Sequence, residues 1–216
     1  YGRNIILVGD LNQLPAILKR ENKRAYQEIE TQFSSLPGYW KMSNAEASIL
    51  RAVETIQSTF PKLGIPEPTL LKEHYRCAPL IARFLNERFY NNELILMTEE
   101  DGTFPHPVLK LCPPCDSDSL LSSSEQVEQA RQLVDAWGTG AEVAIITPYK
   151  AQLRLLDHYF PQDTHVEKGT VHTFQGREKD YVIFSTAARE VSRGGRSFLK
   201  NESLINVAVS RARKSL

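Results

Sequence analysis

Side chains that can bind phosphate recur along this 216-residue chain, in segments that are far apart in the sequence. The segments are residues 9–15, 73–76, 147–152, 173–180 and 210–213. They carry hydroxyls, amides, a turn-forming glycine and arginines, whose guanidinium is permanently charged, planar and able to pair bidentately with an anion. This distribution predicts a ligand site assembled from separate loops.

One of these segments poses a specific choice. Residues 172–188 read HTFQGREKDYVIFSTAA, so a Gln-Gly turn signal with both charge signs stands directly before an apolar, β-type run. A surface hairpin could have this pattern. A loop that handles a ligand at the edge of a parallel sheet could have it too.

The elements that must position these loops alternate along the chain. We expect strands at residues 4–8, 108–111, 142–146, 169–172 and 181–186, and helices at 43–60, 79–89, 125–137, 149–159 and 202–213. Ser43 with Glu46, and Ser122, are the expected helix caps. Alternating strands and helices predict an α/β fold with a mostly parallel sheet. In such sheets ligands bind outside the carboxyl ends of the strands, where we expect the polar loops.

Composition narrows the partners. The chain holds 26 Lys+Arg and 26 Asp+Glu, so a nucleic-acid partner would need a local basic surface. No apolar run approaches the roughly 18 residues of a membrane span, and we expect no membrane partner. Three cysteines are typical of a reducing compartment, which predicts an intracellular protein, cytoplasmic or, in a eukaryote, nuclear.

Five segments, taken together, resemble the superfamily 1 helicases. LVGDLNQLPA resembles their motif III, LKEHYRC their motif IV, AIITPYKAQ their Thr-Pro-Tyr-x-x-Gln motif, GTVHTFQGREKDYVIFS their motif V and LINVAVSRARKSL their motif VI. The five occur in the family's order and reach both ends of the chain. The QGREKD form points to the branch that contains the nonsense-mediated-decay and Dna-replication helicases.

The resemblance implies a RecA-like parallel sheet flanked by helices, with a remnant of the preceding RecA-like lobe. Residues 1–68 would be that remnant with its linker, and residues 69–216 the second lobe. The chain would be the C-terminal part of an ATP-dependent DNA or RNA helicase or translocase, an enzyme that hydrolyses nucleoside triphosphate. Its partners would be single-stranded DNA or RNA and the first lobe of the same protein.

The main elements for ATP and Mg²⁺ would lie upstream of this chain. No G-x-x-x-x-G-K-[ST] phosphate loop occurs in its residues. We therefore expect the fragment alone to be inactive. An alternative is a non-catalytic module, derived from a helicase lobe, that binds nucleic acid or protein.

The resemblance assigns catalytic roles to three residues. Arg76 and Arg211 match the two family arginines that reach the γ-phosphate from the second lobe. Gln13 matches the motif III glutamine that senses this phosphate and the attacking water. A surface salt bridge is the alternative for each arginine, and Arg213 is expected to be a supporting or surface cation.

Four further residues would bind the nucleotide. Gly176 would let the backbone approach it, and Glu178 would accept hydrogen bonds from ribose hydroxyls. Asp10 would hold its own loop or a neighbouring polar group, although a Gly-Asp turn that ends a strand is the alternative. Tyr75 either contacts the nucleotide or packs under Arg76.

The resemblance also places five residues beside the nucleic-acid cleft: Thr147, Tyr149, Gln152, His172 and Thr173. Hydroxyls and backbone amides can hold phosphates without distinguishing sequence. Tyr149 could stack on a base, or it could begin a helix and pack in the core, and the sequence leaves both open.

Two other groups suggest function less strongly. Cys112 and Cys115 have the spacing of a redox or zinc pair, but a zinc site needs four ligands and no second pair exists, so we expect no metal. Arg189, Arg193 and Arg196 form a basic group, for which a solvated charge run is the default. Residues 98–124 are expected to be an irregular connection without an assigned role.

Overall fold

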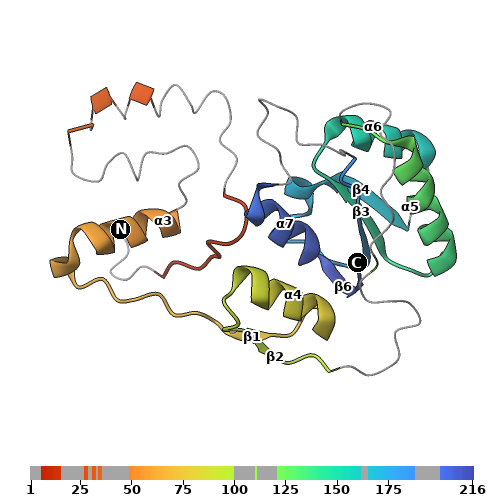
Figure 1. The fold of residues 1–216 in the computed structure, drawn as a ribbon. Coiled ribbons are helices and arrows are strands. Elements are labelled where there is room, and N and C mark those ends of the chain that lie inside the picture. Colours follow the sequence, from red (N-terminus) through yellow and green to blue (C-terminus); the bar gives the residue numbers. More distant parts are fainter. Residues whose placement is uncertain are drawn as a thin grey trace. The chain divides into compact units, whose positions relative to one another are not determined.

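The computed structural model describes residues 6–15, 27–28, 31–32, 34–35, 49–99, 110, 121–161, 165–187 and 200–216. The chain divides into two compact units, Tyr1–Leu70 and Leu71–Leu216 (Figure 1), and each is described by itself. The division falls close to the boundary expected after residue 68. That the units are parts of two RecA-like lobes stays a prediction.

The first unit contains helix α3 (Ile49–Thr59) and the short 3₁₀ helix η1 (Pro61–Leu63). The helix predicted at 43–60 is confirmed from Ile49 onward, and its expected cap lies outside the described residues. The strand predicted at 4–8 is wrong for residues 6–8, which form no strand; Ile6 is 88% and Val8 85% exposed. A strand needs a hydrogen-bonded neighbour, and no described residue pairs with this run.

The second unit is built on a four-stranded sheet. Its strands are β3 (Val143–Thr147), β4 (Val166–Thr170), β5 (Lys179–Phe184) and β6 (Ala212–Ser215), in the order β4-β3-β5-β6, and all neighbours are parallel. Every residue of the central strand β3 is buried. An apolar run buried on both faces is what a parallel sheet requires, so the predicted α/β class with a parallel sheet is confirmed.

Helices cover both faces of this sheet (Figure 1). On one face, α5 (Ser124–Trp137) and α6 (Lys150–Tyr159) form the main apolar cluster with alternate residues of β3, Val143 and Ile145. On the other face, α7 (Glu202–Val209) contacts β5 and the 3₁₀ helix η2 (Val171–Phe174). Because the strands are parallel, the loops that lead into them lie at one edge of the sheet, and the loops that leave them lie at the opposite edge.

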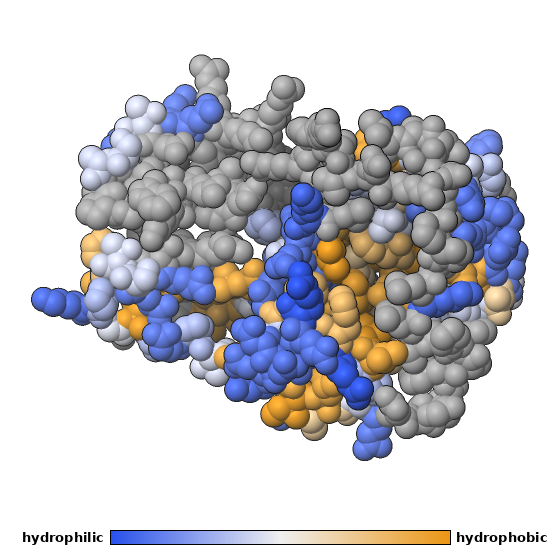
Figure 2. Space-filling model, viewed as in Figure 1, coloured by the Kyte–Doolittle hydropathy of each residue, from blue (hydrophilic) through white to orange (hydrophobic). Residues whose placement is uncertain are grey.

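A small parallel pair lies beside this layered core. It consists of β1 (Glu73–His74) and β2 (Ile95–Leu96), and α4 (Pro79–Phe89) connects the two. Figure 2 shows apolar residues at the surface of this region, where Leu71 is 81%, Ile95 53% and Met97 45% exposed. Because these side chains remain exposed, the pair adds little to the hydrophobic core.

The helices predicted at 79–89, 125–137 and 149–159 agree with α4, α5 and α6 to within one residue at either end. The cap expected at Ser122 is wrong. Ser123 is the N-cap of α5, and its hydroxyl accepts a hydrogen bond from the Gln126 N–H at 3.3 Å. None of the helices in the described residues is long and apolar enough to cross a membrane.

The C-terminal segment departs from its prediction. The helix expected at 202–213 ends at Val209, and β6 follows it. Pairing with β5 overrides the helical pattern: the N–H of Lys179 donates to the carbonyl oxygen of Arg211 at 2.9 Å. This change decides the position of Arg211, which lies in the turn between α7 and β6.

Two other strand predictions are shifted or largely untested. The strand expected at 169–172 lies earlier, as β4, and η2 takes up its last two residues. The strand expected at 108–111 falls outside the described residues except for Lys110, whose N–H donates to the carbonyl oxygen of Leu216 at 2.8 Å.

Candidate functional site

The predicted site residues of the second unit fall at two opposite edges of the parallel sheet. Glu178 directly precedes β5 and Arg211 directly precedes β6, so both lie at the amino-terminal edge. Thr147 ends β3, and His172 follows β4, so both lie at the carboxyl edge. The expectation that all the polar loops gather at the carboxyl ends is therefore wrong, because a loop that leads into a strand lies at the opposite edge from one that leaves it.

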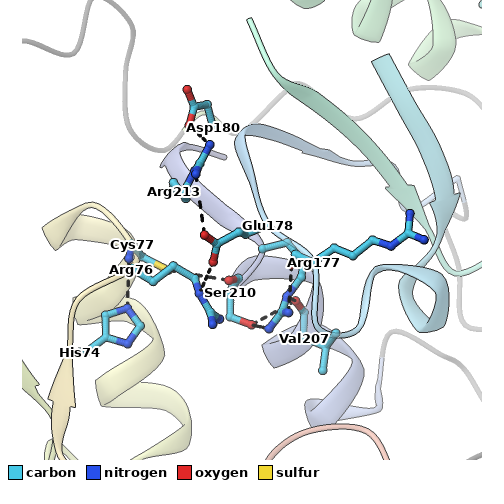
Figure 3. Close-up of polar contacts among 10 residues, drawn as sticks. His74, Arg76, Cys77, Arg177, Glu178, Asp180, Val207, Ser210 and Arg213 are labelled. Atoms are coloured by element: carbon cyan, nitrogen blue, oxygen red, sulfur yellow. Dashed lines mark hydrogen bonds and ion pairs between the residues drawn. The ribbon is translucent and has the colours of Figure 1, made fainter. Parts of the chain in front are cut away.

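At the amino-terminal edge, Arg76 and Glu178 form an ion pair (Figure 3). Arg76 Nε lies 2.7 Å from Glu178 Oε2, and both side chains are about 40% exposed. Arg76 lies between β1 and α4. A backbone hydrogen bond joins the start of α4 to β6: the N–H of Ala78 donates to the carbonyl oxygen of Arg213 at 2.7 Å.

Arg211 lies beside this pair and is almost fully buried, with 2% of its surface exposed. Its Nε donates to the carbonyl oxygen of Val207 at 3.0 Å, Nη1 to that of Arg177 at 3.0 Å, and Nη2 to Ser210 Oγ at 2.8 Å. No carboxylate forms an ion pair with it among the described residues.

The surroundings of Arg211 disfavour its charge. Burial first, and then the nearby charge of Arg76, lower the pKa of Arg211. An arginine remains protonated at neutral pH even so. A buried cation held only by neutral groups is costly, and an anionic ligand would complement it.

A network of ion pairs flanks this cluster. Arg213 Nη2 lies 2.6 Å from Asp180 Oδ1 and 2.9 Å from Glu142 Oε2, and Arg213 Nη1 lies 3.7 Å from Glu178 Oε1. Arg213 therefore occupies a supporting position. Arg177 points away from the cluster in Figure 3 and pairs with Glu167.

Gly176 forms the turn that leads into this edge. Its φ of 83° lies in the left-handed region that favours glycine. The segment is not a hairpin, because β5 pairs only with parallel neighbours, β3 and β6. Of the two interpretations of residues 172–188, the hairpin is wrong and a loop does lie at the edge of a parallel sheet; that this loop handles a ligand stays a prediction.

The residues around Arg76 differ in exposure. Tyr75 is 64% exposed, and its hydroxyl donates to Glu73 Oε2. Cys77 is fully buried, and burial raises the pKa of its thiol to about 11. His74 Nε2 accepts a hydrogen bond from the Cys77 N–H at 3.2 Å, and burial, followed by the charge of Arg76, lowers the pKa of His74.

At the carboxyl edge, the side chains of β3 and of the start of α6 are largely internal. Thr147 is fully buried, and its Oγ1 accepts from the N–H of Tyr149 at 3.3 Å. Tyr149 is 7% exposed, and burial raises its pKa. Of the two roles left open for Tyr149, packing at the start of a helix is the one this geometry favours.

Gln152 is also fully buried, and its amide joins three elements. Its Oε1 accepts from the Ser123 N–H at 2.7 Å, and its Nε2 donates to the Ser123 carbonyl at 3.1 Å and to Ser185 Oγ at 3.1 Å. Gln126 extends the network, because its Oε1 accepts from Ser185 Oγ and from the N–H of Ala187, both at 2.9 Å. The polar atoms of Gln152 are thus engaged inside the protein, which suits a positioning role.

The sequence-based assignment did not include Ser123, Gln126 or Ser185. The resemblance to the Thr-Pro-Tyr-x-x-Gln motif indicated Gln152, and it gave no sign of these three partners. Its partners come from α5 and from the end of β5, and only the fold brings them together.

The segment after β4 is held close to the strand by a glycine. A Cβ on Gly169 would lie 2.4 Å from Thr173 Oγ1 and 2.9 Å from the Phe174 ring. Thr173 is exposed and donates to the carbonyl oxygen of Thr170 at 2.7 Å. His172 Nδ1 is buried and has no hydrogen-bond partner among the described residues.

In the first unit, Asp10 organises the predicted motif III turn. Its Oδ1 accepts from the N–H of Asn12 at 2.9 Å, and its Oδ2 accepts from Gln13 Nε2 at 3.0 Å. Asp10 therefore orients the amide of Gln13, in line with the expectation that it holds its loop or a neighbouring polar group. The two residues are brought together within their own unit.

Metal-binding side chains do not cluster in the described part of the chain: no group of three or more His, Cys, Asp or Glu residues there could hold a metal ion. Cys112 and Cys115 lie outside the described residues, as do Arg189, Arg193 and Arg196.

The chain is similar to known proteins over most of its length. A family model described as an AAA domain matches residues 122–216. A DNA replication ATP-dependent helicase/nuclease of Arabidopsis thaliana is 38% identical over all of this chain and 17% of its own length. A regulator of nonsense transcripts 1 homolog of the same plant is 31% identical over 73% of this chain and 15% of its own length.

A 5'-3' DNA helicase of Mus musculus is 27% identical over 98% of this chain and 11% of its own length. The chain therefore spans less than a fifth of each of these three relatives. The family model, which matches residues 122–216, covers the whole four-stranded sheet and therefore both of its edges.

Proposed function

The chain belongs to the superfamily 1 helicases, and we propose that it forms the C-terminal part of the motor of an ATP-dependent helicase or translocase. Residues 1–68 are then a remnant of the first RecA-like lobe and residues 69–216 are the second lobe. The observation that carries the proposal is the meeting of Arg76, Glu178 and Arg211 at one edge of the sheet.

We propose that this edge takes the triphosphate of ATP. Phosphoryl transfer depends on charge placed around the departing γ-phosphate, and arginines supply that charge without a proton transfer. Arg211 is buried and lacks a carboxylate partner among the described residues, so a phosphate complements it. Arg76 is half-exposed and can turn from Glu178 to the phosphate.

The neighbouring residues fit the rest of a nucleotide. Once Arg76 leaves it, Glu178 can accept hydrogen bonds from ribose hydroxyls. The turn at Gly176 lets the backbone approach the ligand, and Tyr75 is exposed enough for a nucleotide contact. Within the first unit, Asp10 orients Gln13, and the Gln13 amide has the donor and the acceptor that contacts with a γ-phosphate and an attacking water require.

Mg²⁺ would neutralise charge on the phosphates, and its main binding elements, like those of ATP, would lie outside this chain.

We propose that the carboxyl edge borders a single strand of DNA or RNA. Thr173 is exposed there, and His172 carries a buried nitrogen with no described hydrogen-bond partner. The buried Thr147, Tyr149 and Gln152 position the backbone of this edge more readily than they contact the strand. Because DNA and RNA lie inside cells, we also propose that the protein is intracellular.

The test is nucleic-acid-stimulated ATPase activity of the full-length protein. Arg76→Ala and Arg211→Ala should each lower stimulated turnover by about 10³- to 10⁵-fold, the contribution of an arginine finger. Because Arg211 is buried, Arg211→Lys and a thermal melt separate lost chemistry from lost folding. Arg83→Ala, an exposed arginine on α4, is the matched control and should retain turnover. Unchanged turnover in both variants would remove the assignment.

A further inference from the structure

We propose that Lys150 and Arg154 form a phosphate-binding strip on α6 that carries the backbone of the single strand beyond the residues named above. This inference rests on the proposed function, because it extends the carboxyl edge of the same sheet. Neither residue was assigned a role above, although Lys150 lies within the segment 147–152.

Both side chains are exposed and lie on one face of α6. A spacing of four residues brings them to neighbouring positions one turn apart, roughly 6 Å along the helix axis. The opposite face of α6 carries the buried Gln152 and Leu156. The two cations therefore point to solvent with the helix fixed beneath them.

The position of the strip follows from the register of the sheet. Thr147 of β3 lies opposite Thr170 of β4, so the chain leaves both strands at the same edge. From there it runs into α6 on one side and into η2, with His172 and Thr173, on the other. Lys150 is the first residue of α6, and it lies at this edge rather than at the far end of the helix.

The strip differs from the opposite edge of the sheet in how its cations are paired. At the amino-terminal edge, carboxylates neutralise the cations that reach the surface. Ion pairs are formed by Arg76, Arg177, Lys179, Arg213 and Lys214. No such pair involves Lys150 or Arg154 among the described residues. The carboxylate of α6 itself, Asp157, pairs with Lys168 at 3.7 Å.

Two exposed cations with no ion pair to the described residues, together with the exposed Thr173 hydroxyl, match a phosphodiester backbone at this edge. Lysine and arginine hold backbone phosphates as charges and do not distinguish bases. The first turn of α5, which carries Glu125, also begins at this edge and would repel the strand. The path therefore follows α6 and η2. DNA and RNA share the backbone chemistry, so both are tested.

The experiment measures binding of the full-length protein to fluorescently labelled oligothymidylate and oligouridylate over a series of salt concentrations. The variant Lys150→Gln/Arg154→Gln removes both charges and keeps residues of similar helix propensity. Loss of two phosphate contacts makes the slope of log K against log salt shallower by about 1.4, since each contact contributes roughly 0.7 on a single strand. Affinity falls by about 2- to 30-fold.

Two controls accompany this variant. Lys150→Arg/Arg154→Lys keeps both charges and should retain the wild-type slope. Arg83→Gln removes an exposed charge from α4 and should also leave the slope unchanged. A thermal melt of each variant confirms that it is folded.

The outcomes separate the two proposals. A shallower slope in either arm, restored by the charge-preserving variant, supports the strip, and the arm that binds identifies the strand. Wild-type slope and affinity in Lys150→Gln/Arg154→Gln overturn the strip and leave the helicase function standing. If the wild-type protein binds neither oligonucleotide, the strip and the proposed function are both rejected.

Discussion

Arg76 Nε lies 2.7 Å from Glu178 Oε2, so two residues assigned to different parts of a nucleotide are paired with each other. Glu178 is also approached by Arg213 Nη1 at 3.7 Å. The carboxylate thus pairs with Arg76 while a second cation lies on its other oxygen. A bound nucleotide would have to separate the pair, which makes Glu178 the resting partner of the proposed finger.

Glu178→Gln should therefore alter nucleotide binding more than chemistry. We expect a higher KM for ATP with a smaller change in kcat, because a ribose contact is made equally in the ground and transition states. Arg76→Lys should instead lower kcat, since lysine lacks the planar fork. Steady-state ATPase assays of the full-length protein measure both.

The folding stability of Glu178→Gln is the internal control. Both partners are about 40% exposed, so loss of the pair should change the free energy of unfolding by less than about 1 kcal/mol. A larger change, or equal effects of the two variants on KM and kcat, would contradict the separate roles.

Gln152→Ala should destabilise the protein by about 2–4 kcal/mol, because it leaves buried polar groups of Ser123 and Ser185 without partners and opens a cavity. Denaturant unfolding measures the change. Glu128→Ala, an exposed change on α5, should stay within about 0.5 kcal/mol. If Gln152→Ala weakened nucleic-acid binding without loss of stability, a direct contact would be favoured over positioning.

Gly169→Ala should displace η2 from β4 and destabilise the fold by about 1–3 kcal/mol, as overpacking does. The added methyl group would collide with Thr173 and with the Phe174 ring. Gly140 is the matched control, because a Cβ there meets nothing within 4 Å. Thermal melts of the two variants should differ clearly, and equal melting temperatures would show that η2 can yield.

The spacing of apolar residues along the sequence predicted the long helices of this fold and missed its short strands. The helices α4, α5 and α6 carry apolar residues at helical spacing over about three turns. In the structure, residues of each helix on its apolar side are buried, which confirms the three predictions. The strands β1 and β2 have two residues each, too few to show any period. β6 is the sequence Ala-Arg-Lys-Ser, and it becomes a strand only because β5 offers a partner.

The candidate site shows the same division. The five motifs led to Arg76, Glu178 and Arg211, whose roles stay predictions, and the chemistry of these residues gave no sign of the edge at which they lie. That depends on whether a loop enters or leaves a strand, and for Arg211 on the unpredicted β6. The burial of Arg211 and Gln152 likewise follows from elements distant in sequence.

Cys77 should be inert in the folded protein. It is fully buried, and a pKa of about 11 leaves only about 0.1% of the thiol ionised at pH 8. In a Cys112→Ser/Cys115→Ser background, alkylation by iodoacetamide should be slow in buffer and rapid in guanidinium chloride. Labelling at equal rates in the two solutions would show that the loop between β1 and α4 opens freely.

The stability of this loop should depend on the protonation of His74. Its neutral Nε2 accepts the Cys77 N–H, and its pKa is lowered in the folded state, so the unfolded chain takes up a proton first as the pH falls. The contribution is complete above the unfolded pKa of about 6.5 and declines as the pH falls toward the lowered folded value.

His74→Gln removes this titration and isolates its effect. Denaturant unfolding between about pH 8 and pH 5 should show the wild-type protein losing more stability than His74→Gln over the acidic half of the range. Other titrating groups are common to both proteins and cancel in the difference. A constant difference across the range would mean that His74 titrates alike in the folded and unfolded states, against the burial and the nearby Arg76 charge that lower its pKa.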